Sequence, residues 1–172
     1  MTAMAVMVDI EPLLGALPTL VWRWDPETDI LSGSFDPGDA GDGLTGTVEL
    51  SDDAGAIAVL DLTRGALAGL DMVVWPEVTT VAGLQPPDGT RDGRVMLPGA
   101  ADVAAVGALE VDDTLTVRTD SGEQTFHVRF AGSRPRLAVR VADNLLVEVG
   151  EEDELAGFWL TGVPAFPAGE DY

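Results

Sequence analysis

Residues 20–31, LVWRWDPETDIL, give the clearest indication of the fold. Every second residue from Leu20 to Trp24 is large and apolar, which is the period of a β-strand with one buried face. Asp25 and Pro26 then take the first and second positions that a type I turn prefers. The stretch therefore predicts a strand, a sharp reversal and a second strand.

The acids of this stretch are also spaced like the first ligands of an EF-hand calcium loop. That loop needs glycine where Ile30 stands and glutamate where Asp36 stands, and Pro26 would stiffen its entry. We therefore expect a corner between strands at this point and not a calcium site.

The same pattern continues along the chain, where short apolar or alternating runs are separated by clusters of Asp, Gly and Pro. It predicts a mainly β protein, an antiparallel sandwich or open barrel. We expect one or two short helices, with candidates at residues 10–17 and 99–109. The expected strands are 19–25, 30–35, 44–51, 56–62, 70–75, 94–97, 114–119, 123–131, 136–142, 144–149 and 155–161.

The chain divides most naturally at GLQPPDGTRDG, residues 83–93. This gives a first β-rich lobe at 1–84, a linker or boundary at 85–98 and a second β-rich lobe at 99–172; one continuous domain is the alternative. The segments 48–65 and 147–164 share a faint pattern of strand, acidic turn and strand. Two pseudo-repeated β-meander units and ordinary hairpin chemistry both explain that pattern.

Two motifs in the first half read WDPETDIL from Trp24 and DAGAIAVLDL from Asp53. With them, residues 22–62 resemble a small bacterial domain family of unknown function, in which an aromatic-Asp-x-x-x-Asp-x-Leu hairpin precedes an Asp-x-Gly-x-Ile strand. Ser32 replaces the family's second aromatic residue, and Asp61 replaces its usual glutamate. The resemblance implies a compact β-meander unit and brings no activity with it.

Composition limits the compartment and the partners. The chain of 172 residues has 30 acids against nine bases, a net charge of −21, 46% hydrophobic residues and no cysteine. A field of that sign repels nucleic acid and anionic membranes and attracts basic proteins. The cysteine count and the absence of a signal-peptide pattern or a membrane-length apolar run predict a cytoplasmic protein. Coding bias or salt adaptation would produce the same acidity without a partner.

Several chemistries are excluded by what the chain lacks. All nine bases are arginine, so no lysine is present for a phosphate loop or a Schiff base. One histidine is too few for histidine-rich zinc sites. Asp120-Ser121-Gly122 matches the tripeptide of aspartic proteases, but its flanking residues predict a hairpin turn. We therefore expect no cofactor, and we lean against an enzyme.

Two candidate sites remain. Residues 118–140 hold five arginines and the single histidine, and alternation along the strands places several of them on one sheet face. Guanidinium groups there could bind an anion or an acidic partner segment, or could pair with the molecule's own carboxylates. The residues are Arg118, His127, Arg129, Arg136 and Arg140. The acidic loop that contains Asp36, Asp39 and Asp42 is a candidate metal site.

These observations favour a non-catalytic binding module for a basic protein partner, of the kind represented by immunity or antitoxin-like inhibitors. Electrostatic attraction would speed the encounter of such a module with its partner, and salt would weaken the association. Two alternatives stay open: a hydrolase whose active site consists of carboxylates, and a structural homo-oligomer. We expect no nucleic-acid or membrane partner.

Overall fold

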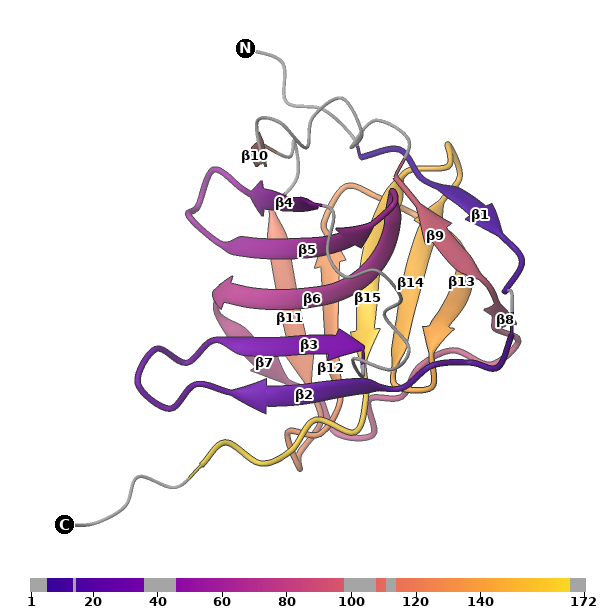
Figure 1. Cartoon of the computed structure of the whole chain (residues 1–172). Coiled ribbons are helices and arrows are strands. Elements are labelled where there is room, and N and C mark those ends of the chain that lie inside the picture. The colour runs from indigo at the N-terminus through magenta and orange to yellow at the C-terminus, as the bar shows by residue number, and fades with distance from the viewer. Residues whose placement is uncertain (1–5, 14, 36–45, 98–107, 111–113, 168–172) are drawn as a thin grey trace, which may run out of the picture.

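The computed structural model describes residues 6–13, 15–35, 46–97, 108–110 and 114–167. Within these ranges the protein is built from β-strands and has no helix. Two sheets pack face to face as a sandwich that is not closed into a barrel. In Figure 1 the strands β2 to β6 of the front sheet run horizontally, and β11, β12, β15 and β14 of the rear sheet run vertically behind them. The prediction of a mainly β sandwich is confirmed.

The first sheet contains eight of the described strands, and all of its pairs except β10–β4 are antiparallel. Its main order is β1-β9-β6-β5-β4-β10, and the hairpin of β2 and β3 joins it where β3 pairs with β6. The strands are β1 (Asp9–Glu11), β2 (Leu20–Trp24), β3 (Leu31–Phe35), β4 (Gly46–Ser51), β5 (Ile57–Thr63), β6 (Ala66–Val74), β9 (Arg94–Met96) and β10 (Ala108–Glu110).

The second sheet contains seven described strands in the order β7-β11-β12-β15-β14-β13-β8. Its edge strands β7 and β8 pair in parallel with their neighbours, and the five central strands are antiparallel. The strands are β7 (Val78–Thr80), β8 (Arg91–Asp92), β11 (Leu115–Thr119), β12 (Phe126–Phe130), β13 (Pro135–Ala142), β14 (Leu145–Gly150) and β15 (Leu155–Leu160).

The opening stretch forms the β2–β3 hairpin that its sequence predicts. The carboxylate of Asp25 accepts the backbone N–H of Glu27 at 2.9 Å, and Asp29 has a φ of 59°. The indole of Trp22 lies directly over Gly33, its partner across the hairpin, because no Cβ blocks the ring there. Its Nε1–H donates to the carbonyl of Thr161 at 3.0 Å, which ties the hairpin to the end of β15.

One hydrophobic core lies between the sheets and takes side chains from both. Along β12 the apolar residues Phe126, Val128 and Phe130 face this core, as the alternation of the sequence predicts. The carboxylate of Asp52 also joins the two sheets: it follows β4, and it accepts the backbone N–H of Leu115 at the start of β11 at 2.8 Å.

The eleven expected strands correspond to strands of the structure, and four further strands, β1, β7, β8 and β10, are only two or three residues long. The helix expected at 10–17 is wrong, because β1 includes Ile10 and the described residues that follow are not helical. Most of the helix expected at 99–109 lies outside the described residues, and its last two positions belong to β10. No described segment is an apolar helix of membrane-spanning length.

The division of the chain into lobes stays a prediction. In the structure, β7 comes from the first half of the chain and joins the second sheet, whereas β10 comes from the second half and joins the first sheet. The boundary expected at 85–98 contains β8 and β9, which belong to different sheets. The echoing segments 48–65 and 147–164 form the β4–β5 and β14–β15 hairpins, one in each sheet.

Candidate functional site

Four of the five predicted arginine and histidine residues lie on the outer face of the second sheet, and they are Arg118, His127, Arg129 and Arg140. Cross-strand pairing places Arg118, His127, Trp159, Leu146 and Arg140 in one row across five adjacent strands. Residues that pair across strands point to the same side of a sheet, so this row faces away from the core.

A second row beside it holds Thr116, Arg129, Gly157, Glu148 and Ala138. We call the surface formed by Arg118, His127, Arg129, Arg140 and Trp159 the arginine face.

His127 is the centre of a buried network on this face. Its Nδ1 lies 3.1 Å from an Nη of Arg118, and its Nε2 lies 2.5 Å from Oε1 of Glu148. Arginine can only donate, so Nδ1 is the acceptor and Nε2 carries the proton that is donated to Glu148. The ring also stacks on Trp159, with ring centroids 3.9 Å apart.

Arg136 lies on the same strand as Arg140 but is engaged elsewhere. Its guanidinium donates to the carboxylate of Asp153 at 2.6 Å, in the turn between β14 and β15. The structure therefore brings Arg118, Arg129 and Arg140 to one face and pairs Arg136 separately.

The predicted metal residues Asp36, Asp39 and Asp42 lie outside the described residues. Among the residues that the structure does describe, no group of three or more acids or histidines is arranged to hold a metal ion. Asp120 caps the β11–β12 turn, where its carboxylate accepts the N–H groups of Thr125 and Gln124. These backbone hydrogen bonds, that of Thr125 first, lower the pKa of Asp120.

Asp61 and Asp71 form a different acidic pair, on the outer face of the first sheet. Burial, with a smaller contribution from the charge of Asp71, raises the pKa of Asp61 to about 6. Burial also raises the pKa of Asp71, and a hydrogen bond from Ser32 opposes that shift. The raised pKa values of these two carboxyl groups follow from their burial in the sheet, and we assign no ligand to them.

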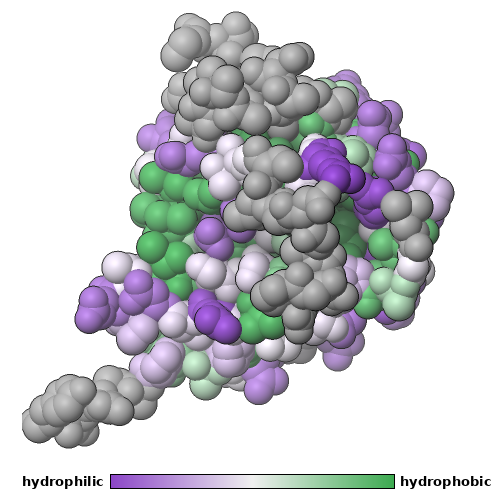
Figure 2. Space-filling model, viewed as in Figure 1, coloured by the Kyte–Doolittle hydropathy of each residue, from purple (hydrophilic) through white to green (hydrophobic). Residues whose placement is uncertain are grey.

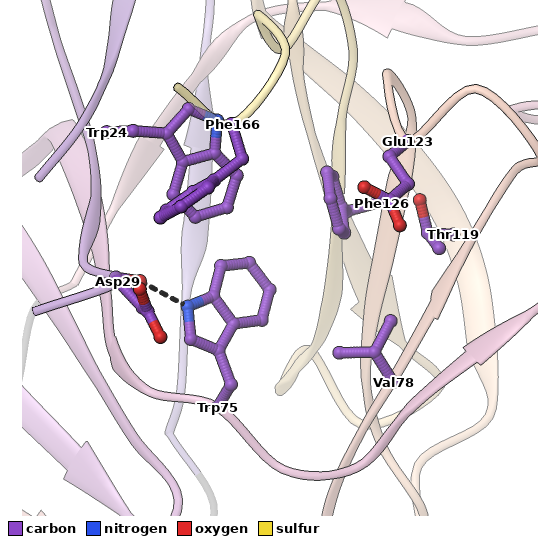
Figure 3. Close-up of a pocket in the computed structure, with 8 residues that line it drawn as sticks. All are labelled: Trp24, Asp29, Trp75, Val78, Thr119, Glu123, Phe126 and Phe166. Atoms are coloured by element: carbon purple, nitrogen blue, oxygen red, sulfur yellow. Dashed lines mark hydrogen bonds between the residues drawn. The ribbon is translucent and has the colours of Figure 1, made fainter. Parts of the chain in front are cut away.

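A cleft that the sequence did not predict opens between the ends of the two sheets (Figure 3). It has a volume of about 330 Å³, within the range of small-ligand pockets. One wall comes from the first sheet, the opposite wall comes from the second sheet, and Phe166 reaches in from the C-terminal segment (Figure 3). The lining residues are Trp24, Asp29, Trp75, Val78, Thr119, Glu123, Phe126 and Phe166.

Four aromatic rings line this cleft and contact one another, and we call it the aromatic cleft. Trp24 stacks on Trp75 at a centroid distance of 5.7 Å and meets Phe166 edge-on at 5.2 Å. Phe126 lies 5.4 Å from Trp75. Such contacts hold the rings in fixed positions. Each pair of rings stabilises the fold by about 1 kcal/mol beyond the contribution of the area that it buries.

Hydrogen bonds fix the two tryptophans further. Trp24 Nε1–H donates to the carbonyl of Pro164 at 2.8 Å, and Trp75 Nε1–H donates to the carbonyl of Asp29 at 2.8 Å (Figure 3). Both indole N–H groups are thereby satisfied within the protein. The cleft consequently presents ring faces and edges to a ligand, and its polar groups are supplied by other residues.

Two carboxylates stand on opposite sides of the aromatic cleft. Asp29 is on the β2–β3 turn and Glu123 is on the β11–β12 turn (Figure 3). Both residues have positive backbone φ angles, 59° and 54°, which residues other than glycine seldom adopt. Both turns end at the cleft, so the two hairpins together determine where the carboxylates lie.

The surroundings of the cleft are apolar. Among the described residues, only five large hydrophobic side chains are exposed; two of them, Val78 and Phe166, line the cleft, and Val74 immediately precedes Trp75. Figure 2 shows a hydrophobic patch at the left of the molecule, over the ends of β5 and β6. The surface near Trp75 therefore combines exposed apolar groups with flanking acids.

Comparison with known proteins gives no match, either to a protein-family model or to a curated protein sequence. The resemblance of residues 22–62 to a small bacterial domain family accordingly stays a prediction. In the structure this segment contributes the β2–β3 hairpin and the antiparallel pair β4–β5, both in the first sheet.

Proposed function

We propose that the protein is a non-catalytic binding module for a basic protein partner, and that the aromatic cleft receives a cationic side chain of that partner. The observation that carries this proposal is the combination of four aromatic rings with two opposed carboxylates on a chain of charge −21. An arginine or lysine head group fits both features at once.

Ring faces attract cations because their electron density is highest above the ring plane. A cation over a tryptophan gains about 0.5–2 kcal/mol, with the larger values in desolvated sites. Asp29 and Glu123 would supply hydrogen-bond acceptors for the same group, and an acceptor of opposite charge roughly doubles the strength of such a bond. Aromatic residues in partly closed pockets are also the residues that most often dominate protein interfaces.

The charge of the whole molecule would act on the rate of association. Opposite net charges steer partners together, and the effect decreases as salt screens the field beyond about 8–10 Å at physiological ionic strength. We therefore expect the on-rate to fall strongly with salt, whereas the contribution of the cleft falls less. This difference separates a specific site from general attraction.

An arginine-rich peptide is a suitable probe, and the four tryptophans provide a fluorescence signal. We expect saturable binding that weakens about fivefold or more when Trp75 is replaced by leucine or Glu123 by glutamine, which corresponds to roughly 1 kcal/mol. Glu77→Gln is the matched control, because Glu77 is exposed near Trp75 but does not line the cleft.

Equal weakening by Glu123→Gln and Glu77→Gln, together with no effect of Trp75→Leu, would mean that the peptide binds through net charge alone. That result, or no binding of the peptide at low salt, would overturn the proposal. The immunity or antitoxin-like role and the cytoplasmic location are part of the same proposal. The hydrolase and homo-oligomer alternatives stay predictions, which a hydrolase panel and light scattering would test.

A further inference from the structure

The arginine face has an unusual number of buried hydrogen-bond donors without acceptors. Among the described residues, four buried side-chain polar atoms have no partner, and three of these are on this face: Trp159 Nε1, Arg129 Nε and Arg140 Nε. Trp159 is only 5% exposed. Buried donors are almost always satisfied in folded proteins, so three on one face leave room for an acceptor that the described side chains do not supply.

The described carboxylates do not supply that acceptor. Glu148, on the row beside the arginines, is bonded to His127, and the only ion pair of a described arginine with a described carboxylate is that of Arg136 with Asp153. The other arginine bonds on this face go to uncharged acceptors: His127 Nδ1, the carbonyl of Ser133 and the hydroxyl of Thr90. Within the described structure the arginines of this face therefore outnumber its carboxylates, Glu148 and Asp92, by three to two.

Local charge outweighs the net charge of the molecule at this position. At physiological salt, interactions between exposed charges fade beyond about 8 Å, so the distant acids act weakly on a group held at the face. Arg118, Arg129 and Arg140 carry three positive charges there. Against them stand two carboxylates, Glu148, which is bonded to His127, and Asp92, which pairs with Arg140 across β8 and β13, so three positive and two negative charges leave the described part of the face at +1.

We propose that the arginine face binds a small oxyanion, namely a phosphate or carboxylate group of a small molecule. The guanidinium groups of Arg129 and Arg140 would donate charge-assisted hydrogen bonds to its oxygens, and the Trp159 N–H would donate a further one. Arg118 would add charge while it remains bonded to His127. This site is separate from the aromatic cleft and has the opposite charge preference.

The test is an NMR titration of the ¹⁵N-labelled protein with inorganic phosphate, at constant low ionic strength maintained with sodium chloride. Three of the four indole N–H groups, those of Trp22, Trp24 and Trp75, already donate to carbonyls. The Trp159 signal is therefore the one that should move downfield, and it should saturate. Acetate titrated in the same way shows whether carboxylate or phosphate binds more tightly.

Variants assign the effect to individual donors. Arg129→Gln and Arg140→Gln should each weaken phosphate binding about tenfold, the size expected for one charge-assisted hydrogen bond. Trp159→Phe keeps the stacked ring, removes only the N–H, and should weaken binding by a smaller factor. Arg136→Gln is the matched control, since it removes the same charge from the same strand at a residue that is already paired. An unchanged pattern of backbone signals confirms that each variant is folded.

Saturation of the Trp159 signal with the expected order of variants supports the proposal, whichever of the two anions binds more tightly. The absence of a saturable Trp159 shift with both anions overturns it. Equal weakening by Arg136→Gln and Arg140→Gln also overturns it, because binding would then follow net charge. A response to an acidic peptide but to neither small anion would assign the face to a protein segment and reject the small oxyanion.

Discussion

His127 and Glu148 are joined by a hydrogen bond although their strands are not neighbours. β15 lies between β12 and β14, and the residue of β15 that pairs with Glu148 is Gly157. A Cβ at Gly157 would lie 2.9 Å from Oε1 of Glu148 and 2.4 Å from the carbonyl oxygen of Val128. Because Gly157 has no side chain, it leaves open the space above β15 in which the side chains of His127 and Glu148 meet.

Replacement of Gly157 by alanine should break this bond and destabilise the protein by about 2 kcal/mol or more, because a rigid backbone oxygen cannot move away from the new methyl group. Chemical denaturation measures the loss. Gly122→Ala is the control: the same methyl group in the β11–β12 turn would meet no atom closer than 3.8 Å. The single histidine also reports on the site, since its ¹⁵N spectrum should show the Nε2–H tautomer in the wild type. Equal stabilities of the two variants would contradict the close approach at Gly157.

Asp52 has a purely structural role. Its Oδ1 accepts the N–H groups of Ala54 and Ala56 at 3.0 and 2.9 Å, and its Oδ2 accepts the N–H of Leu115 from the other sheet at 2.8 Å. Asparagine at this position has one oxygen and an NH₂ group that cannot accept, so at least one buried N–H loses its partner. We expect Asp52→Asn to destabilise the protein by about 2–3 kcal/mol.

Asp53→Asn is the control for this prediction, because its neighbouring carboxylate is exposed. Thermal unfolding of the two variants should give a clearly lower Tm for Asp52→Asn alone. A similar small change in both would mean that the Asp52 bonds are replaced by water at little cost, and that the sheets are held together by their core alone.

Much of the fold is predictable from the sequence because alternation and turn residues act locally. Phe126, Val128 and Phe130 define one strand face without any knowledge of the partner strand, and the same alternation places His127 on the opposite face with Arg129. Strands of two or three residues escape such reasoning, since β7 and β8 are too short to show a period. They can be recognised only in the structure, because each pairs with a longer strand, β7 with β11 and β8 with β13.

The sites are less predictable because they depend on contacts between distant segments. Glu148 is the one acid in the apolar run of β14, a signal of a buried partner, but nothing local identifies that partner as His127. Trp75 packs against the core and also lines the cleft, since the chain leaves the first sheet after Val74 and enters the second at Val78. Two tryptophans at strand ends of the first sheet, Trp24 at the end of β2 and Trp75 just after β6, are the signal that would have indicated a cleft.

Asp61 should make the stability of the protein decrease as pH rises from about 4 to 6. Its carboxyl has a pKa of about 6 in the folded state against an ordinary value of 3.8, so the folded state binds more protons than the unfolded chain in this range. Stability therefore falls while the carboxyl of the unfolded chain is ionised and that of the folded state is still protonated, and the loss is complete above about pH 6, where both are ionised. Asp61→Asn removes the charge and should stabilise the protein at pH 7 by on the order of 1–2 kcal/mol.

Denaturation of both proteins at several pH values tests this sign. The gain from Asp61→Asn should be largest at neutral pH and should vanish near pH 4, where the wild-type carboxyl is protonated in the folded state. Asp92→Asn, at an exposed position of β8, controls for the general benefit of removing one charge from an acidic protein. If the two variants gained equally at every pH, the local burial of Asp61 and its proximity to Asp71 would not be the cause, and the molecule's overall negative charge would explain the gain instead.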